Sequence, residues 1–551
     1  MPHLRSLLGT LTLLLTLTCS SLSTAQNVQS QPKLVAELDY GTFQGAYSSV
    51  YNISYWQRIP FAAPPTGSNR FRAPQPPIPL PDGAVYNSSQ PFDMCPQRTV
   101  NGSEDCLYLG LYSRPWNPSL PLRPVVVVFY GGGFIEGSAY FALPPSAYPV
   151  LNVSASSDLV FIYPNYRVNA FGFLAGSEVA SSPTSDSNAG LLDQRAAIQW
   201  ANRYAAHFGG DPDDVSIWGQ SAGGGSVLAQ TIANQSFFPD GQPPPPRFRK
   251  ALASSPYWPK TYTSTSPETQ WIYDTMVNRT GCSSSSSSSA QDTLACLKSV
   301  PVQTIRDASL YVASSHTYNT SSYTWAPVID SFLPNPLSEA TTRTGQVNVV
   351  SAFGMYNTHE GENFIPSSSL LSTPTDFDTW LTGFLPTLRK CELDAVRRYY
   401  PPTGTTDTST YNTTSVRAGL VYRDVVLACP AYWTASSTTT HDSNGGSSSW
   451  LGEYTISPAK HASDTYWWNQ VNPAQKTDPL HYTGYTGAFA SFFMTGDPNT
   501  QKLTPPDVVG VPALNTGKEF VINAAGFANT DIKQLKKRCD FWRKLAPRIP
   551  I

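Results

Sequence analysis

The stretch Val215-Ser216-Ile217-Trp218-Gly219-Gln220-Ser221-Ala222-Gly223 decides the fold of this chain. Its first four residues have the apolar character of a buried strand, and residues 222–228 can begin a helix. A Gly-x-Ser-x-Gly pattern between a strand and a helix is typical of a tight, strained turn, where a side chain at either glycine would clash. Five residues can match by chance in a chain with 37 glycines, so the setting carries the prediction. It predicts that Ser221 is a nucleophile held on this turn.

Apolar runs of strand length recur on both sides of this turn. The runs are residues 125–130, 159–163, 215–219 and 347–354. Runs that are apolar on both faces indicate strands buried under helices, as in a parallel sheet. Residues 188–207 have apolar positions at helical spacing and predict a crossover helix. The order strand, helix, strand predicts an α/β class with a large, mostly parallel twisted sheet flanked by helices.

The chain before this region has a different pattern. Residues 34–61 alternate and break often, which predicts short antiparallel strands ahead of the main sheet. A second glycine cluster, Gly131-Gly132-Gly133-Phe134, follows the run 125–130 directly. Without side chains, its backbone N–H groups can approach a substrate oxygen, although a plain tight turn would have the same composition.

Composition restricts the class of partner. Charged residues make up 13% of the chain and the formal net charge is −2. No basic stripe or acidic tail indicates nucleic acid or a charged membrane surface, so we expect a small neutral molecule as the partner.

The N-terminus predicts export. Arg5 precedes a Leu/Thr-rich run over residues 7–17, and Ser23-Thr24-Ala25 is a small-x-small cleavage pattern. The run is too short to span a bilayer, so we expect a signal peptide over residues 1–25, removed after Ala25, and a single mature domain over residues 26–551. No later stretch predicts a membrane anchor, and the mature protein should be secreted and extracellular.

Cysteines and glycosylation sequons agree with that route. Removal of the signal leaves seven cysteines, an odd number, so one thiol should stay unpaired in an oxidising compartment. The sequons stand at Asn52, Asn87, Asn101, Asn152, Asn234, Asn278, Asn319 and Asn412. So many sequons favour a eukaryotic secretory route and a glycoprotein.

Several blocks together resemble the type-B carboxylesterase and cholinesterase-like lipase family, as a secreted fungal-type member. The blocks are Arg58-Ile59-Pro60-Phe61-Ala62-Ala63-Pro64-Pro65-Thr66-Gly67 with Arg70-Phe71, Glu104-Asp105-Cys106-Leu107-Tyr108-Leu109, Tyr166-Arg167-Val168, Asn188-Ala189-Gly190-Leu191-Leu192-Asp193-Gln194-Arg195, Phe208-Gly209-Gly210-Asp211-Pro212, and the serine motif itself. The resemblance covers most of the chain and implies the α/β-hydrolase fold.

The same resemblance implies a catalytic triad. Glu360, followed by Gly361, is similar to the family's acid, with Glu362 as the nearby alternative. His461 lies in a block similar to the family's histidine signature, with His481 as its rival. The helical segment 487–493 and Thr495-Gly496-Asp497-Pro498-Asn499 follow as in the family and favour His461. The order Ser, Glu, His is that of α/β-hydrolases.

Further roles also come from the resemblance. It implies an oxyanion hole of Gly132, Gly133 and Ala222, and places Ser255 and Asp464 behind His461, where ordinary loop positions are an equal alternative. It implies structural ion pairs of Arg70 with Glu104 and of Arg167 with Asp193. It implies disulfides of Cys95 with Cys106, Cys282 with Cys296, and Cys429 with Cys539, leaving Cys391 over. No cofactor and no metal are expected.

Departures from the family pattern bear on the substrate. If Cys95 pairs with Cys106, the loop between them, residues 96–105, is short, which argues against a large lipase lid. This loop also has no aromatic residue that could bind a choline cation. Gln220 replaces the acidic residue common before the serine, which also argues against choline esters. Gly110, His359 and Ala462 depart as well, and His359 could alter the charge around Glu360. Trp467-Trp468 could line a gorge or belong to the core.

These observations predict a serine carboxylic-ester hydrolase that acts on neutral esters through an acyl-enzyme on Ser221. A triacylglycerol lipase of the same family is the alternative for the substrate, an ester or acylglycerol. A non-catalytic binding homologue is less favoured, because all three triad positions are filled. Acyl transfer to another acceptor would share the intermediate. Nothing in the sequence indicates the oligomeric state.

Overall fold

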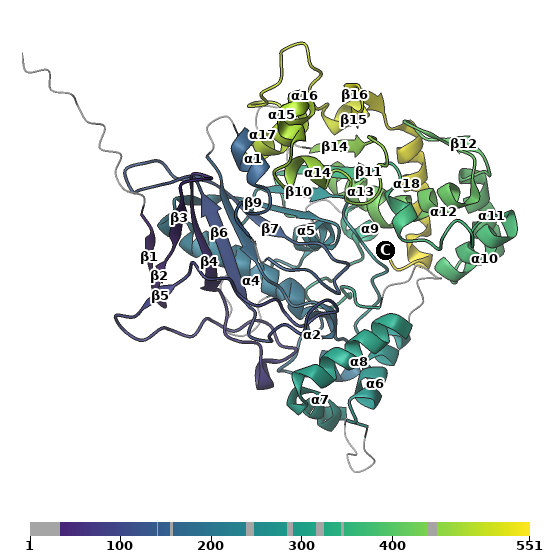
Figure 1. Cartoon of the computed structure of the whole chain (residues 1–551). Coiled ribbons are helices and arrows are strands. Elements are labelled where there is room, and N and C mark those ends of the chain that lie inside the picture. The colour runs from purple at the N-terminus through teal and green to yellow at the C-terminus, as the bar shows by residue number, and fades with distance from the viewer. Residues whose placement is uncertain are drawn as a thin grey trace, which may run out of the picture.

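The apolar runs form the centre of an eleven-stranded sheet (Figure 1). The computed structural model describes residues 33–139, 142–154, 158–237, 247–283, 290–315, 324–342, 347–438 and 449–551. The sheet has the order β16-β15-β14-β11-β10-β9-β7-β8-β6-β4-β3. Its strands are β3 (Ala46–Ser48), β4 (Ile53–Pro60), β6 (Tyr108–Ser113), β7 (Arg123–Phe129), β8 (Val160–Pro164), β9 (Gly210–Gln220), β10 (Lys250–Ser254), β11 (Ser351–Asn357), β14 (Ser449–Tyr454), β15 (Lys518–Asn523) and β16 (Gly526–Asp531).

The centre of this sheet is parallel, as the apolar runs predicted. Strands β8, β7, β9, β10, β11, β14 and β15 pair in parallel, whereas β16 at one edge and β6, β4 and β3 at the other pair antiparallel. The predicted strand 347–354 was wrong in its limits. The N–H groups of Val350 and Ser351 both donate to the carbonyl of Arg249, so the chain enters the sheet at Ser351 and stays in it to Asn357.

The early antiparallel strands are confirmed. Strands β1 (Val35–Leu38) and β2 (Gly41–Gln44) pair antiparallel, and β2 pairs with β5 (Val85–Asn87) in a separate three-stranded sheet. Strands β3 and β4 form the antiparallel edge of the main sheet. A two-stranded pair, β12 (Gly404–Thr405) with β13 (Thr410–Tyr411), lies outside both.

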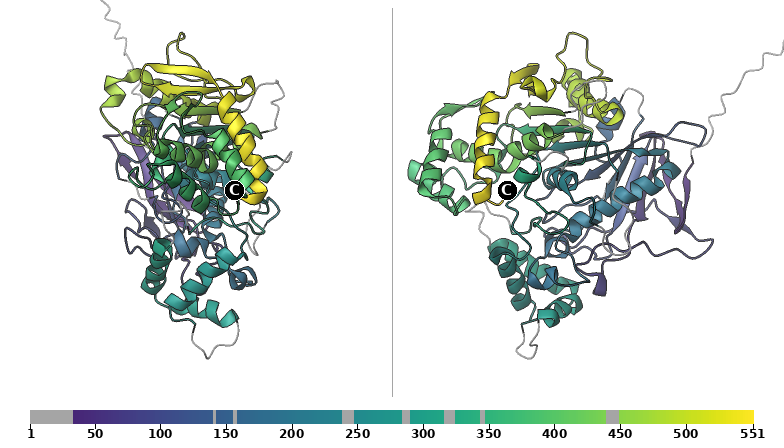
Figure 2. Two further views of the ribbon diagram at one scale, coloured as in Figure 1. Left: turned by 90° about the vertical axis from the view of Figure 1, so that its right-hand side faces the viewer. Right: turned by 180° about the vertical axis from the view of Figure 1, so that it is seen from behind.

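Alternate residues of the central strands supply two hydrophobic clusters, one on each face of the sheet. Val125, Val127 and Phe129 of β7 belong to one cluster, and Val126 and Val128 belong to the other. Helices α4 (Ala189–Tyr204), α5 (Ala222–Ile232), α13 (Cys429–Ser436) and α18 (Lys533–Leu545) contribute to the first cluster. Helices α1 (Tyr148–Val153) and α17 (Gly487–Thr495) contribute to the second, so helices flank both faces (Figures 1 and 2). Apolar residues on both faces of each strand explain why its sequence does not alternate.

The helices follow the same order along the chain. They are α1 (Tyr148–Val153), α2 (Asn169–Phe173), α3 (Ser177–Ala180), α4 (Ala189–Tyr204), α5 (Ala222–Ile232), α6 (Pro267–Arg279), α7 (Ala290–Ser299), α8 (Val302–Ser315), α9 (Leu337–Ala340), α10 (Pro374–Phe384), α11 (Lys390–Tyr399), α12 (Thr414–Arg423), α13 (Cys429–Ser436), α14 (Thr465–Trp468), α15 (Ala474–Thr477), α16 (Pro479–His481), α17 (Gly487–Thr495) and α18 (Lys533–Leu545). The predicted crossover helix 188–207 is α4 followed by a 3₁₀ turn, η2 (Ala205–Phe208). Helices α6, α7 and α8 form a separate group at the bottom of Figure 1.

Three disulfides cross-link the fold with the pairing that the resemblance implied. They join Cys95 to Cys106, Cys282 to Cys296, and Cys429 to Cys539, the last tying α13 to α18. Cys391 is a free, exposed thiol. The ion pairs of Arg70 with Glu104 (2.6 Å) and of Arg167 with Asp193 (2.7 Å) are formed between buried or nearly buried side chains.

The sequons lie mostly on the surface. The exposed asparagines are Asn52, Asn87, Asn101, Asn152, Asn278 and Asn412, and Asn234 is half-buried. Asn319 and the predicted signal peptide lie outside the described residues. Within the described ranges, no helix combines the length and the apolar character needed to cross a membrane.

Candidate active site

Ser221 lies on a strained turn between β9 and α5. Its backbone has φ 59° and ψ −127°, a conformation that L-residues rarely adopt. The two flanking glycines make this turn possible. A Cβ on Gly219 would lie 2.2 Å from the carbonyl of Gly223, and a Cβ on Gly223 would lie 2.0 Å from the carbonyl oxygen of Phe129 in β7. The turn therefore presses against the neighbouring strand and projects the serine from the end of the sheet.

The three predicted triad side chains meet at this end of the sheet. His461 Nε2 lies 2.8 Å from Ser221 Oγ, and His461 Nδ1 lies 3.0 Å from Glu360 Oε2. Ser221 follows β9, Glu360 follows β11 in the 3₁₀ turn η4 (Glu360–Asn363), and His461 follows β14. These strands are parallel, so their carboxyl ends lie at the same edge and bring together residues far apart in the sequence.

Burial differs among these groups. Glu360 is fully buried, Ser221 is 8% exposed, and the His461 side chain is 11% exposed. One Glu360 oxygen accepts from the imidazole, whereas Oε1 finds no hydrogen-bond partner within the described part of the chain. A carboxylate shielded from water on one side of the imidazole interacts strongly with any positive charge that forms there.

The rival residues are engaged elsewhere. Glu362 accepts a hydrogen bond from His359 Nδ1 (2.9 Å) and lies 3.6 Å from Lys460 Nζ. His481 is buried, with Nδ1 2.7 Å from Asp478 and Nε2 2.8 Å from the carbonyl of Asn523. The geometry therefore favours Glu360 over Glu362 and His461 over His481, and the unusual His359 pairs with Glu362.

Asp464 and Ser255 do not bond to the imidazole directly. Asp464 is buried and accepts from Asn357 Nδ2, Trp468 Nε1 and Tyr485 OH, each at 3.1 Å. Burial raises its pKa, the hydrogen bonds oppose this shift, and the nearby charge of Glu360 adds to it. Asn357 Nδ2 also donates to the carbonyl of Lys460, which precedes the histidine, so Asp464 supports the His461 loop through Asn357.

Ser255 follows β10, the strand between β9 and β11. Its backbone is left-handed, with φ 46°, and its N–H donates to the carbonyl of Met355. Its hydroxyl is buried without a hydrogen-bond partner among the described residues. The structure thus gives Ser255 a place at the edge of the site and no bond to His461.

Trp467 and Trp468 belong to the core. Both are buried; Trp467 stacks on His481, and Trp468 packs against Trp218 of β9 with ring centroids 4.9 Å apart. The gorge interpretation of this pair is therefore wrong.

Three further residues contact His461. Asn363 Oδ1 accepts from the His461 backbone N–H at 3.0 Å, and Gln220 Nε2 lies 3.4 Å from His461 Nε2. The Phe364 ring meets the imidazole edge to face at 4.9 Å and is stacked between Tyr257 and Tyr422. No motif distinguishes Asn363 or Phe364 from other loop positions, whereas Gln220 lies within the serine motif itself.

The glycine cluster turns back against the nucleophile. Gly132 and Gly133 have φ 111° and 64°, and a Cβ on Gly131 would lie 2.9 Å from Ser221 Cβ. Among the residues that the structure describes, no acceptor takes up the N–H groups of Gly132, Gly133 or Ala222. These three N–H groups therefore remain open to an acceptor on a ligand. Nor does any cluster of three or more His, Cys, Asp or Glu side chains within the described ranges suit a metal ion.

This topology, with Ser, Glu and His in a row at the strand ends, defines an α/β-hydrolase. The crystal structure of Aspergillus niger EstA is similar at a TM-score of 0.78 and 26% identity, covering 95% of this chain and 99% of that one. The sequence model of the carboxylesterase family matches residues 32–542, and the chain belongs to this family.

Curated relatives include secreted fungal proteins. Secreted lipase 1 of Botryotinia fuckeliana is 30% identical over 59% of this chain, and the match spans 59% of that protein, less than two thirds of its length. The secreted lipase of Arthroderma benhamiae is 29% identical over 80% of this chain and 83% of its own.

Proposed function

We propose that this protein is a serine carboxylic-ester hydrolase, with Ser221 as nucleophile, His461 as base and Glu360 as acid. One observation carries the proposal: His461 lies within hydrogen-bond distance of both Ser221 Oγ (2.8 Å) and Glu360 Oε2 (3.0 Å). Membership of the carboxylesterase family supports the reaction type.

The reaction proceeds in two halves. Ser221 Oγ attacks the ester carbonyl while His461 Nε2 takes its proton, and the same nitrogen then protonates the departing alcohol. Water attacks the acyl-enzyme with His461 again as base, releasing the acid. Glu360 holds the imidazole in the required tautomer and stabilises its positive form. The N–H groups of Gly132, Gly133 and Ala222 stabilise the negative carbonyl oxygen, where the loss of one such donor typically costs ~10²–10³ in rate.

We infer that the protein is exported as a glycoprotein after removal of residues 1–25. Three disulfides and exposed sequon asparagines support an oxidising secretory route. The Botryotinia and Arthroderma relatives are named as secreted, which agrees with this inference.

We propose small neutral esters as substrates in preference to emulsified triacylglycerol. The loop over residues 96–105 is short, carries no aromatic side chain and is fixed to its neighbours by hydrogen bonds, so it supports neither a large interfacial lid nor choline recognition. The names of the relatives favour the lipase alternative. A chain-length series of nitrophenyl esters beside emulsified triolein separates the two, because activity that rises sharply only above the solubility limit of the substrate would overturn the preference for small esters.

A fluorophosphonate probe tests the core of the proposal. We expect one probe per folded wild-type molecule, none on Ser221→Ala, and ester hydrolysis lost in parallel. A folded wild-type protein that the probe does not label would overturn the proposal in favour of a non-catalytic binding homologue. Product analysis with competing alcohols distinguishes hydrolysis from acyl transfer.

A further inference from the structure

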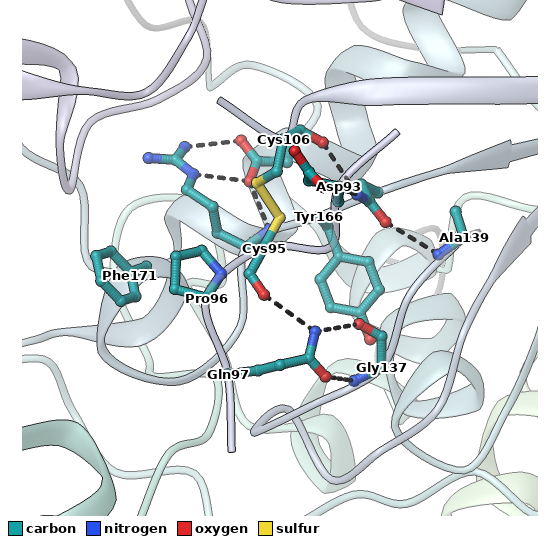
Figure 3. Close-up of a disulfide and its surroundings, with 12 residues drawn as sticks. Asp93, Cys95, Pro96, Gln97, Cys106, Gly137, Ala139, Tyr166 and Phe171 are labelled. Carbon is teal, nitrogen blue, oxygen red and sulfur yellow. Dashed lines mark hydrogen bonds and ion pairs between the residues drawn. A yellow bond between two sulfur atoms is a disulfide. The ribbon is translucent and has the colours of Figure 1, made fainter. Parts of the chain in front are cut away.

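The loop closed by the Cys95–Cys106 disulfide lies directly against the glycine turn that follows β7 (Figure 3). We propose that Gln97, in this loop, is a positioning residue that holds residues 131–137 so that the N–H groups of Gly132 and Gly133 face the reacting carbonyl. This inference rests on the proposed function, since it assigns the support of the proposed oxyanion hole.

Gln97 binds both polar groups of a single residue in the turn. Its Nε2 donates to the carbonyl of Gly137 and its Oε1 accepts from the Gly137 N–H, each at 2.9 Å (Figure 3). The same Nε2 donates to the carbonyl of Cys95 at 3.0 Å. The side chain is 1% exposed, so water cannot readily replace these bonds. Gln97 is therefore a buried bridge from the disulfide to the turn.

Gly137 closes the turn onto its own beginning. Its backbone has φ 121°, and a Cβ there would lie 2.4 Å from the carbonyl oxygen of Gly131. Inside the turn, the carbonyl of Gly132 accepts from the N–H groups of Ile135 and Glu136, both at 3.1 Å. Because the two ends of the turn touch, a displacement at Gly137 moves Gly131 and Gly132 as well.

The bridge has a fixed support on its other side. The disulfide joins Cys95 to Cys106, and Arg306 Nε donates to the Gln97 carbonyl at 2.7 Å. Asn165 is fully buried; its Nδ2 donates to the carbonyl of Cys106 (3.1 Å) and its Oδ1 accepts from the N–H of Ala139 (2.9 Å). Two buried amides thus connect the disulfide loop to the chain on the far side of the glycine turn.

Such a support matters because the donors of an oxyanion hole act only at ~2.7–3.1 Å from the transition-state oxygen. A misplacement of ~1 Å can cost ~10²-fold in rate even when its cause lies away from the reacting atoms. Since Gln97 contacts the turn and not the substrate, its loss should weaken binding of the transition state more than binding of the substrate.

The experiment compares wild type with Gln97→Met, which keeps the length and loses both bonds to Gly137, and Gln97→Glu, which keeps only an acceptor for the Gly137 N–H. Gln475→Met is the matched control. Gln475 also bridges a backbone N–H (Asn472, 2.9 Å) and a backbone carbonyl (Gln470, 2.8 Å), but in α15, outside the site. The measurements are kcat and KM on a soluble nitrophenyl ester, the Kd of a trifluoromethyl ketone with the same acyl chain, and fluorophosphonate labelling taken to completion.

We expect kcat of Gln97→Met to fall ~10–100-fold, with KM within ~3-fold of wild type. The affinity for the ketone, which binds as an oxyanion, should fall by the same factor. Gln97→Glu buries a carboxylate that faces the carbonyls of Gly137 and Cys95, so it should lose at least as much as Gln97→Met, and Gln475→Met should match wild type. Complete labelling of each variant shows that the folded site and its nucleophile survive. Unchanged kcat and ketone affinity in a fully labelled Gln97→Met or Gln97→Glu would overturn the inference, whereas failure to label wild type would overturn the proposed function instead.

Discussion

Replacement of Glu360 by glutamine removes a charge from the triad at nearly constant shape. Glu360 Oε2 lies 3.0 Å from His461 Nδ1, and the imidazole becomes positive as it takes the serine proton. Two unit charges ~4 Å apart attract by ~4 kcal/mol at an effective dielectric of ~20. Loss of this attraction in the transition state should lower kcat by ~10³-fold, at ~1.4 kcal/mol per factor of ten. KM should change little, because a neutral substrate does not sense the charge.

Stopped-flow and steady-state hydrolysis of a nitrophenyl ester measure both parameters. The matched control is Glu362→Gln, two residues away in the same 3₁₀ turn, whose carboxylate bonds to His359 and not to His461. We expect its kcat to stay within ~5-fold of wild type, since its carboxylate pairs with His359 and Lys460 rather than with a triad side chain. A loss below ~10-fold for Glu360→Gln, or an equal loss for Glu362→Gln, would refute the electrostatic role of Glu360.

Three further predictions concern the scaffold. Gly223→Ala places a Cβ 2.0 Å from the carbonyl oxygen of Phe129, so kcat should fall by more than ~10²-fold, and wild-type kcat would contradict the elbow geometry. The double variant Cys429→Ser, Cys539→Ser opens a loop of 110 residues, and the chain entropy of this loop should lower the free energy of unfolding by ~4.8 kcal/mol. Urea titration measures the free energy of unfolding, and a loss under ~1 kcal/mol would contradict this entropic role of the disulfide. Burial lowers the pKa of Lys260 from 10.5 to about 8, so the unfolded chain binds this proton more tightly. The difference in free energy of unfolding between wild type and Lys260→Met should therefore rise by ~3 kcal/mol from pH 8 to 10.5. A difference that does not change with pH would contradict the lowered pKa of Lys260.

The sheet was largely predictable because its strands are buried on both faces. Such strands become continuous apolar runs, and residues 125–130, 159–163 and 215–219 lie within or next to β7, β8 and β9. The start of β11 was misplaced because the apolar residues from Val347 precede the sheet. The start of the strand is set by hydrogen bonds from the N–H groups of Val350 and Ser351 to the carbonyl of Arg249, a residue distant in sequence.

The site was predictable only where the chemistry leaves a local pattern. Gly-x-Ser-x-Gly is visible because the tight turn at Ser221 leaves no room for a Cβ at Gly219 or at Gly223. The contacts of Asn363 and Phe364 with His461 depend on how separate loops meet in space, and no spacing records that. The resemblance placed Asp464 behind His461, but nothing in the sequence indicates that Asp464 reaches the His461 loop through Asn357.

The triad is spread over the ends of three strands, and 240 residues separate Ser221 from His461. Strand β14, which precedes His461, pairs with β11, and β11 connects through β10 to β9. Pairings between such distant segments form late, after local helices and turns. Turnover should therefore be the last signal to return when denatured protein refolds, lagging behind helical circular dichroism. Esterase activity would then report completion of the whole sheet rather than the formation of any one part.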